Sequence, residues 1–202
     1  MKILFLLPNM YLNFGVPHGL ATLVAILKKH GHEVEVFDFT FIKTERDTKI
    51  SSGQIMQKTS TTIYDLVRSD PVENIEEKFA KKLQSFKPDL IGVSATSYTF
   101  DMGINLLNKL KSSIDCPVIV GGVHASLAPE DAIKPKIVDF ICIGEGEKFI
   151  IEFCDCLSKG KDYRDILNLG YKINDKIIIN KLRPFVDLDS LPAPDWSAFD
   201  ER

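Results

Sequence analysis

The stretch KPDLIGVSATS, residues 87–97, carries the pattern on which the predicted fold depends. Residues 87–89, with a proline at their centre, predict a turn. Residues 90–94 then form a short, largely apolar run, which is typical of a parallel strand covered on both of its faces. A hydroxyl-rich segment follows at once. The stretch therefore predicts a buried strand that ends in a polar loop.

Strand and helix patterns alternate on both sides of this stretch. Strands are predicted at residues 2–7, 33–39, 117–120 and 140–143, and helices at 19–29, 73–86, 101–113, 128–133 and 147–157. Asp101 is the expected N-cap of the helix at 101–113. This alternation predicts an α/β, Rossmann-like, doubly wound fold, with a mainly parallel five-stranded sheet and helices on both faces.

Two segments depart from the alternation. Residues 40–71 are rich in Ser, Thr, Lys and Asp, and we expect an insertion with one or two short helices there. Residues 169–173 and 176–180 flank Asn174-Asp175 and predict a C-terminal β-hairpin, and the proline-broken residues 183–202 predict a linker. We therefore expect one domain at 1–160, with the insertion at about 40–71, and a hairpin and linker at 161–202.

The composition excludes several classes of function. The 202 residues include 25 Lys and Arg against 28 Asp and Glu, a formal charge of −3, which argues against nucleic-acid or anionic-membrane binding. No window holds the roughly 18 consecutive apolar residues of a membrane span. The apolar N-terminus is too short for a secretory signal and is interpreted as the first strand. The 4 cysteines do not suggest a disulfide framework, so we expect a cytoplasmic protein.

The candidate site lies where the predicted strands end. Sheets of this kind bind ligands beyond the carboxyl ends of their strands, and the loops at 8–19, 94–100, 121–126 and 144–147 meet there. The glycine pair at 121–122 fits either a close ligand approach or a tight turn. The GEGE segment at 144–147 matches only part of a dinucleotide fingerprint. The hydroxyl groups at 94–99 suit either ligand contacts or helix caps.

Neither a metal site nor a catalytic residue is expected in this chain. His18 and His124 are the only histidines at the predicted ligand edge, and neither has a partner at ligand spacing. Cys154 and Cys156 are two residues apart on a helix, so they do not face the same way. A phosphoacceptor receiver domain is excluded as well, because residues 8–9 and 94 are not acidic.

Together these motifs resemble one family. MKILFLLPN, VPHGLATLVAILKKHGHEVEVFDF, KPDLIGVSATS, PVIVGGVHAS and DFICIGEGE resemble, in this order, the cobalamin-binding N-terminal domain of B12-dependent radical SAM enzymes. The resemblance covers about residues 1–160. Residues 189–196, DSLPAPDW, are similar to the segment that leads from that domain into the radical SAM barrel. The order and spacing of the motifs carry the resemblance.

The resemblance implies a cofactor and a set of residues that bind it. The corrin would lie across the carboxyl edge of the sheet, with its nucleotide tail running down beside it. The implied contacts are Pro17, His18, Gly19, Ser94, Thr96, Ser97, Gly121, Gly122, Val123, His124, Gly144, Glu145 and Gly146. A parent protein of this kind would also use a [4Fe-4S] cluster and S-adenosylmethionine, neither bound by this segment.

Two departures from related patterns refine the expectation. His18 does not lie in the Asp-x-His-x-x-Gly sequence of methionine-synthase-like cobalamin domains, since Val16 precedes it by two residues, so a His-off mode is expected. The cluster motif Cys-x3-Cys-x2-Cys is absent. We therefore expect catalysis, by resemblance a methyl transfer, to reside in a missing C-terminal radical SAM domain of the same parent chain. A nucleotide- or sugar-nucleotide-binding enzyme, or a docking scaffold without B12, remains an alternative.

Overall fold

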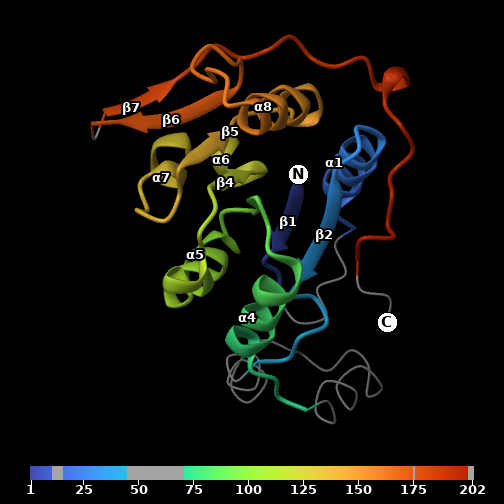
Figure 1. Cartoon of the computed structure of the whole chain (residues 1–202), viewed down its shortest axis with the longest axis vertical. Coiled ribbons are helices and arrows are strands. Elements are labelled where there is room, and N and C mark those ends of the chain that lie inside the picture. The colour runs from blue at the N-terminus through green and yellow to red at the C-terminus, as the bar shows by residue number, and fades with distance from the viewer. Residues whose placement is uncertain (11–15, 45–70, 175, 200–202) are drawn as a thin grey trace, which may run out of the picture.

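A seven-stranded sheet forms the centre of the molecule (Figure 1). It is seen in a computed structural model that describes residues 1–10, 16–44, 71–174 and 176–199. The strand order is β2-β1-β3-β4-β5-β6-β7, in which the first five strands are parallel and the last two antiparallel. The strands are β1 (Lys2–Leu7), β2 (Glu33–Asp38), β3 (Leu90–Ser94), β4 (Val118–Gly121), β5 (Phe140–Cys142), β6 (Leu169–Ile173) and β7 (Lys176–Ile179).

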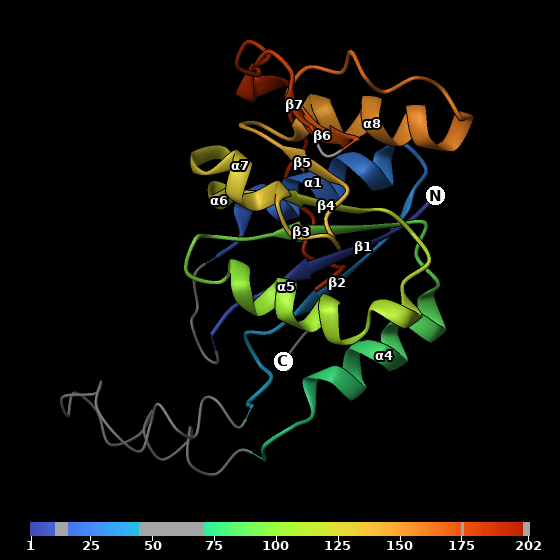
Figure 2. The same cartoon turned by 90° about the vertical axis from the view of Figure 1, so that its left-hand side faces the viewer.

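Helices cover both faces of this sheet (Figure 2). The helices are α1 (His18–Lys29), α4 (Ile75–Phe86), α5 (Phe100–Lys109), α6 (Val123–Leu127), α7 (Pro129–Ile133) and α8 (Glu147–Lys159), with single 3-10 turns at Lys111–Ser113 and Leu188–Ser190. Helices α1 and α8 share one hydrophobic core with the sheet, and the helices from α4 to α7 share the core on the other face. The α/β fold with a mainly parallel sheet is thus confirmed.

Strand β1 shows why these runs form doubly covered strands. Its residues Leu4 and Leu6 are buried in the core on the α4–α5 side, and Ile3 and Phe5 are buried in the core on the α1–α8 side. Successive side chains of a strand point to opposite faces, so a parallel strand between two helix layers must be apolar throughout. The chain winds outward in both directions from β1 and β3, which makes the end of these strands a topological switch point.

The predicted number of five strands is wrong, because the C-terminal hairpin joins the sheet. Strand β6 pairs with β5, which would otherwise leave its backbone groups unpaired at the edge. Gly170 makes this pairing possible: it lies opposite Ile141, and a Cβ atom there would lie 2.5 Å from the Ile141 Cγ1 atom. Asn174 has the positive φ of 47° that a tight hairpin turn requires.

Two details of the helices also differ from the sequence prediction. The residue at the N-cap of α5 is Thr99, and Asp101 lies in its first turn instead of at the cap. The loop predicted at 121–126 contains the short helix α6, which begins directly after Gly122. A separate helix α7 follows because Pro129, which cannot donate a backbone hydrogen bond, sits at its first position.

The segment predicted as a linker packs against the domain. We call residues 183–199 the C-terminal strap; in Figure 1 it runs from the end of the hairpin past α1 to the β2 edge of the sheet. The Asp195 amide donates to the Ala21 carbonyl at 3.0 Å, and the Val36 amide of β2 donates to the Ala198 carbonyl at 3.0 Å. The strap thus hydrogen-bonds to both α1 and β2. The predicted insertion lies largely at 45–70, outside the described residues.

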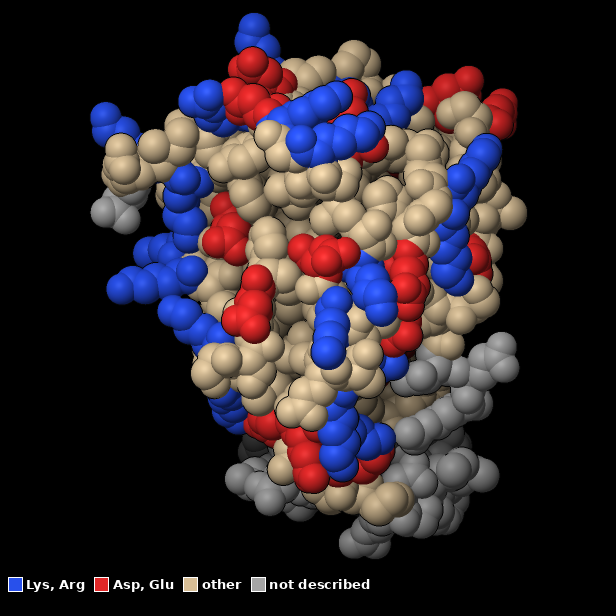
Figure 3. Space-filling model, in the orientation of Figure 1, with Lys and Arg blue, Asp and Glu red and all other residues tan. Residues whose placement is uncertain are grey.

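The surface carries charges of both signs. Over the face shown in Figure 3, Lys and Arg side chains lie among Asp and Glu side chains. Several form ion pairs, such as Lys28 with Asp195 at 3.2 Å and Lys82 with Glu35 at 2.8 Å. Within the described ranges, none of the helices is long and apolar enough to cross a membrane.

Candidate ligand cavity

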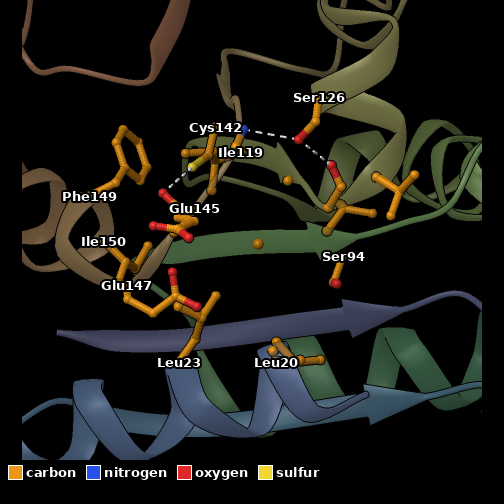
Figure 4. Close-up of a pocket in the computed structure, with 18 of the residues that line it drawn as sticks. Leu20, Leu23, Ser94, Ile119, Ser126, Cys142, Glu145, Glu147, Phe149 and Ile150 are labelled. Atoms are coloured by element: carbon orange, nitrogen blue, oxygen red, sulfur yellow. Dashed lines mark hydrogen bonds between the residues drawn. The ribbon is translucent and has the colours of Figure 1, made fainter. Parts of the chain in front are cut away.

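A cavity of about 470 Å³ lies between the sheet and the helices α1 and α8, where β3, β4 and β5 end (Figure 4). This volume is within the range of small-molecule binding sites. The sheet contributes Phe5, Gly92, Ile119, Gly121 and Cys142, α1 contributes Gly19, Leu20 and Leu23, and α8 contributes Glu147, Phe149 and Ile150. The walls are therefore mostly apolar, with a few polar groups among them.

Two glycines in the strands open the floor of the cavity. A Cβ atom at Gly92 would lie 2.5 Å from the Phe5 Cε1 atom, so only glycine leaves the Phe5 ring in its present position. At Gly121 the nearest atom to such a Cβ is the Cys142 Cβ, 3.8 Å away, which is an ordinary contact. A side chain at position 121 would therefore not clash with the backbone, and its absence leaves space for a ligand.

Gly122 serves a different purpose, because it shapes the turn from β4 into α6. Its φ of 90° and ψ of −165° lie in a region that is essentially restricted to glycine. A Cβ atom there would lie 2.8 Å from the Ala95 carbonyl oxygen. The same oxygen accepts a hydrogen bond from the His124 amide at 3.1 Å. The turn therefore packs directly on the loop after β3, which supports the tight-turn interpretation for this glycine.

Side chains tie the glycine-containing loops together at the mouth of the cavity. The Ser126 hydroxyl accepts a hydrogen bond from the Gly144 amide at 2.9 Å and donates one to the Gly122 carbonyl at 3.0 Å. The Glu145 carboxylate accepts a hydrogen bond from the Val186 amide of the strap at 2.6 Å. The mouth is thus a set of loops held in fixed positions before any ligand arrives.

The structure brings together most, but not all, of the residues proposed from the sequence. Those that line the cavity are Gly19, Ser94, Gly121, Gly122, Val123, Gly144, Glu145 and Gly146. Pro17, His18, Thr96, Ser97 and His124 are not among the lining residues. Residues that line the cavity but were not proposed include Leu20, Leu23, Glu147, Phe149, Ile150 and Phe185. Leu20, Leu23, Phe149 and Ile150 look in sequence like ordinary core positions of α1 and α8.

The two histidines at this edge have contacts of their own. His124 is only 6% exposed, its ring stacks on Phe100 with centroids 4.0 Å apart, and its Nδ1 atom lies 3.1 Å from the Ser97 hydroxyl. The His18 ring packs edge-on against the ring of Trp196 in the strap, with the ring centroids 5.4 Å apart. Among the described residues, no group of three His, Cys, Asp or Glu side chains is placed to hold a metal ion.

Three of the four thiols are kept protonated by their surroundings. Burial raises the pKa of Cys142, on the cavity wall, from 9.0 to about 12, and the negative charge of Glu147 adds to this effect. Burial likewise raises the pKa of Cys154 to about 12 and that of Cys116 to about 11. All four cysteines are free. Because the unfolded chain ionises such thiols near pH 9.0, folding stability is expected to fall as the pH rises above that value.

The raised pKa values lead to a prediction about alkylation. With iodoacetamide at pH 8, we expect Cys156 in the native chain to be modified first, because burial raises the pKa of the other three thiols and only the thiolate reacts. Their rates should be lower by about a hundredfold, and all four should react equally in urea. Peptide mass spectrometry after timed quenching measures this. Equal labelling of Cys142 and Cys156 in the native chain would contradict the burial of Cys142.

The fold and the cavity together define a class of protein. A mainly parallel α/β sheet with a glycine-lined cavity at its switch point is a Rossmann-like ligand-binding domain. The particular family follows from a comparison with known families: the model of the B12 binding domain matches residues 11–153. The chain belongs to this family.

Two curated relatives match nearly the whole chain. An uncharacterised methyltransferase of Pyrococcus horikoshii, PH0819, is 29% identical over 206 residues, covering 97% of this chain and 38% of the relative. The cytidylyl-2-hydroxyethylphosphonate methyltransferase of Streptomyces wedmorensis is 22% identical over 206 residues, covering 89% of this chain and 36% of the relative. The chain thus spans little more than a third of the length of these relatives.

Solved structures share the fold. The cobalamin-dependent S-adenosylmethionine radical enzyme OxsB, with aqua-cobalamin and S-adenosylmethionine bound, matches with a TM-score of 0.69 and 18% identity, over 96% of this chain and 24% of that one. The radical S-adenosylmethionine methyltransferase TsrM from Kitasatospora setae matches with a TM-score of 0.66 and 19% identity, over 89% of this chain and 30% of that one. At these identities the likeness concerns the fold.

Proposed function

We propose that this chain is the cobalamin-binding module of a B12-dependent radical SAM methyltransferase, and that it holds the nucleotide tail of the cofactor in the cavity and the corrin over the mouth. The observation that carries the proposal is the cavity itself, since a member of the B12-binding family has its pocket at the switch point of the sheet. Bound cobalamin would supply a cobalt centre able to carry a methyl group.

The residues present fit such a ligand. The apolar side chains of Phe5, Leu23 and Phe149 suit the flat aromatic base of a nucleotide tail. Gly121 leaves room for it at the end of β4, and Gly92 lets the Phe5 ring lie against the neighbouring strand. The Ser94 hydroxyl is a neutral donor, which suits a tail with a single phosphate that needs little counter-charge.

The remaining proposed contacts act at the rim of the cavity or shape its walls. Thr96 donates its amide to the Thr99 hydroxyl at 3.2 Å, and Ser97 contacts His124, so both keep the loop after β3 in its conformation. Pro17 and His18 precede Gly19 at the start of α1 and would approach the cofactor from that side. Among the described residues that line the cavity there is no histidine, and the His18 ring packs against Trp196; both observations support a His-off mode.

A further domain of the parent chain would complete the site. We propose that residues 1–160 bind cobalamin, that residues 161–202 lead towards a C-terminal radical SAM domain, and that this domain holds the [4Fe-4S] cluster and S-adenosylmethionine. Large apolar side chains at the mouth support this proposal: Val123 is 55% exposed, Leu127 76% and Phe185 90%. Exposed apolar patches of this kind are typical of contact surfaces.

The free cysteines fit a cytoplasmic location.

Titration of the purified chain with hydroxocobalamin tests the proposal. We expect about one equivalent of corrinoid to stay with the protein through desalting, with the visible spectrum of a base-off, His-off cobalamin. Calorimetric titration with ATP and a UDP-sugar tests the nucleotide-binding alternative in parallel, and no heat of binding is expected. Absence of cobalamin binding by the full-length parent chain would contradict the proposal, and a spectrum with a histidine-bound cobalt would overturn the His-off mode.

A further inference from the structure

One polar atom in the cavity wall has no partner. The Oε2 atom of Glu147 is buried, and no described residue forms a hydrogen bond with it. Glu145, the other acidic side chain at the cavity, does have a hydrogen-bond partner: its Oε2 atom accepts a hydrogen bond from the Val186 amide at 2.6 Å. Within the described part of the chain, the Glu145 Oε2 atom thus has a donor and the buried Glu147 Oε2 atom has none.

The surroundings of Glu147 make this state costly for the protein alone. Glu147 is the first residue of α8, and Figure 4 shows its side chain beside Leu23, across the cavity from Ser94. Phe149 and Ile150 on the same helix line the cavity with it. A buried oxygen that loses its water without gaining a donor destabilises the folded state. Such atoms are rare in proteins and often mark the place of a ligand.

We propose that the Glu147 carboxylate recognises the nucleotide end of the bound corrinoid by accepting a hydrogen bond from a hydroxyl group of its ribose. This inference rests on the proposed function. A ribose hydroxyl supplies the donor that the unpartnered Oε2 atom of Glu147 can accept. Because only a corrinoid with a nucleotide carries this hydroxyl group, Glu147 discriminates between corrinoids with and without a nucleotide.

The position of Glu147 assigns this contact to the tail and not to the corrin ring. The cavity extends from the strand ends to Phe5 and Gly92. Glu147 lines the same cavity as these two residues. A volume of about 470 Å³ accommodates a nucleoside but not a whole cobalamin, which is several times larger. The broad corrin must therefore stay at the mouth, where the glycine loops and the exposed Val123 and Leu127 lie.

The test compares two corrinoids on three variants. Glu147→Leu removes both acceptor oxygens at similar size, Glu147→Gln keeps one carbonyl acceptor, and Glu152→Gln removes a charge from the same helix outside the cavity, where Glu152 pairs with Arg183. Equilibrium dialysis measures the Kd of hydroxocobalamin and of cobinamide, which lacks the nucleotide. The melting temperature of each ligand-free variant is measured in parallel with the dialysis experiments.

We expect Glu147→Leu to weaken cobalamin binding by about tenfold and cobinamide binding by less than about twofold. Glu147→Gln should fall between this variant and the wild type, and Glu152→Gln should match the wild type for both ligands. The ligand-free Glu147→Leu variant should melt at a higher temperature than the wild type, because it no longer buries an unsatisfied oxygen. An equal loss of both corrinoids, or no loss of either, would overturn the role of Glu147. A full-length wild-type parent chain that binds neither corrinoid would instead contradict the proposed function.

Discussion

Replacing Gly121 by leucine is expected to abolish the retention of cobalamin while the fold stays intact. The side chain would start at the end of β4 and extend into the cavity between the sheet and helices α1 and α8. Its Cβ atom meets nothing closer than the Cys142 Cβ at 3.8 Å, so the backbone need not move. The space that the nucleotide tail requires is then filled, and we expect affinity to fall by more than about a hundredfold.

A matched substitution separates blocking of the cavity from a general effect of added bulk. Ser113→Leu places the same side chain at an exposed position in the 3-10 turn after α5, away from the cavity. Both variants are purified, checked by circular dichroism, and titrated with hydroxocobalamin before desalting. Cobalamin retained by Gly121→Leu at the level of the wild type would show that the tail does not occupy this cavity.

Most of the fold could be predicted from the sequence because local patterns specify it. Short apolar runs and helical stripes are encoded within ten or so residues, and the observed β1, α1, β3 and α8 lie within a residue or two of their predicted positions. The C-terminal hairpin was predicted correctly, but its addition to the sheet was not, and the reason is physical. Whether β6 extends the sheet depends on a contact between Gly170 and Ile141, and no local pattern reveals a pairing between distant residues.

The candidate site was predictable only in its loops. Glycines and hydroxyl residues in the loops after strands are conspicuous in sequence, and six of those proposed do line the cavity. Leu20 and Phe149 line it as well, but their spacing is that of any core-facing helix. His124 shows the opposite case: it follows a glycine pair at the ligand edge, yet its ring is buried against Phe100 and does not line the cavity. The direction of a side chain at such a position is set by tertiary packing, which the local sequence does not reveal.

Gly122→Ala is expected to destabilise the folded chain strongly, in contrast to its neighbour. The backbone at Gly122 has φ 90° and ψ −165°, a conformation that costs an alanine about 1–3 kcal/mol. The added Cβ would also lie 2.8 Å from the Ala95 carbonyl oxygen, which belongs to the backbone and cannot rotate away. We expect the melting temperature to fall by about 5–10 °C, on the scale of 2–4 °C per kcal/mol for a domain of this size.

Gly121→Ala is the matched control, because it adds the same methyl group one residue earlier. Its Cβ finds only the ordinary 3.8 Å contact, so the melting temperature should stay within about 2 °C of the wild type. Differential scanning calorimetry of the two ligand-free variants measures the difference. Equal melting temperatures would mean that the turn from β4 into α6 can relax. This result would contradict the claim that the turn requires glycine at position 122. The expected contrast instead assigns separate tasks to adjacent glycines: Gly122 builds the turn, and Gly121 keeps the cavity open.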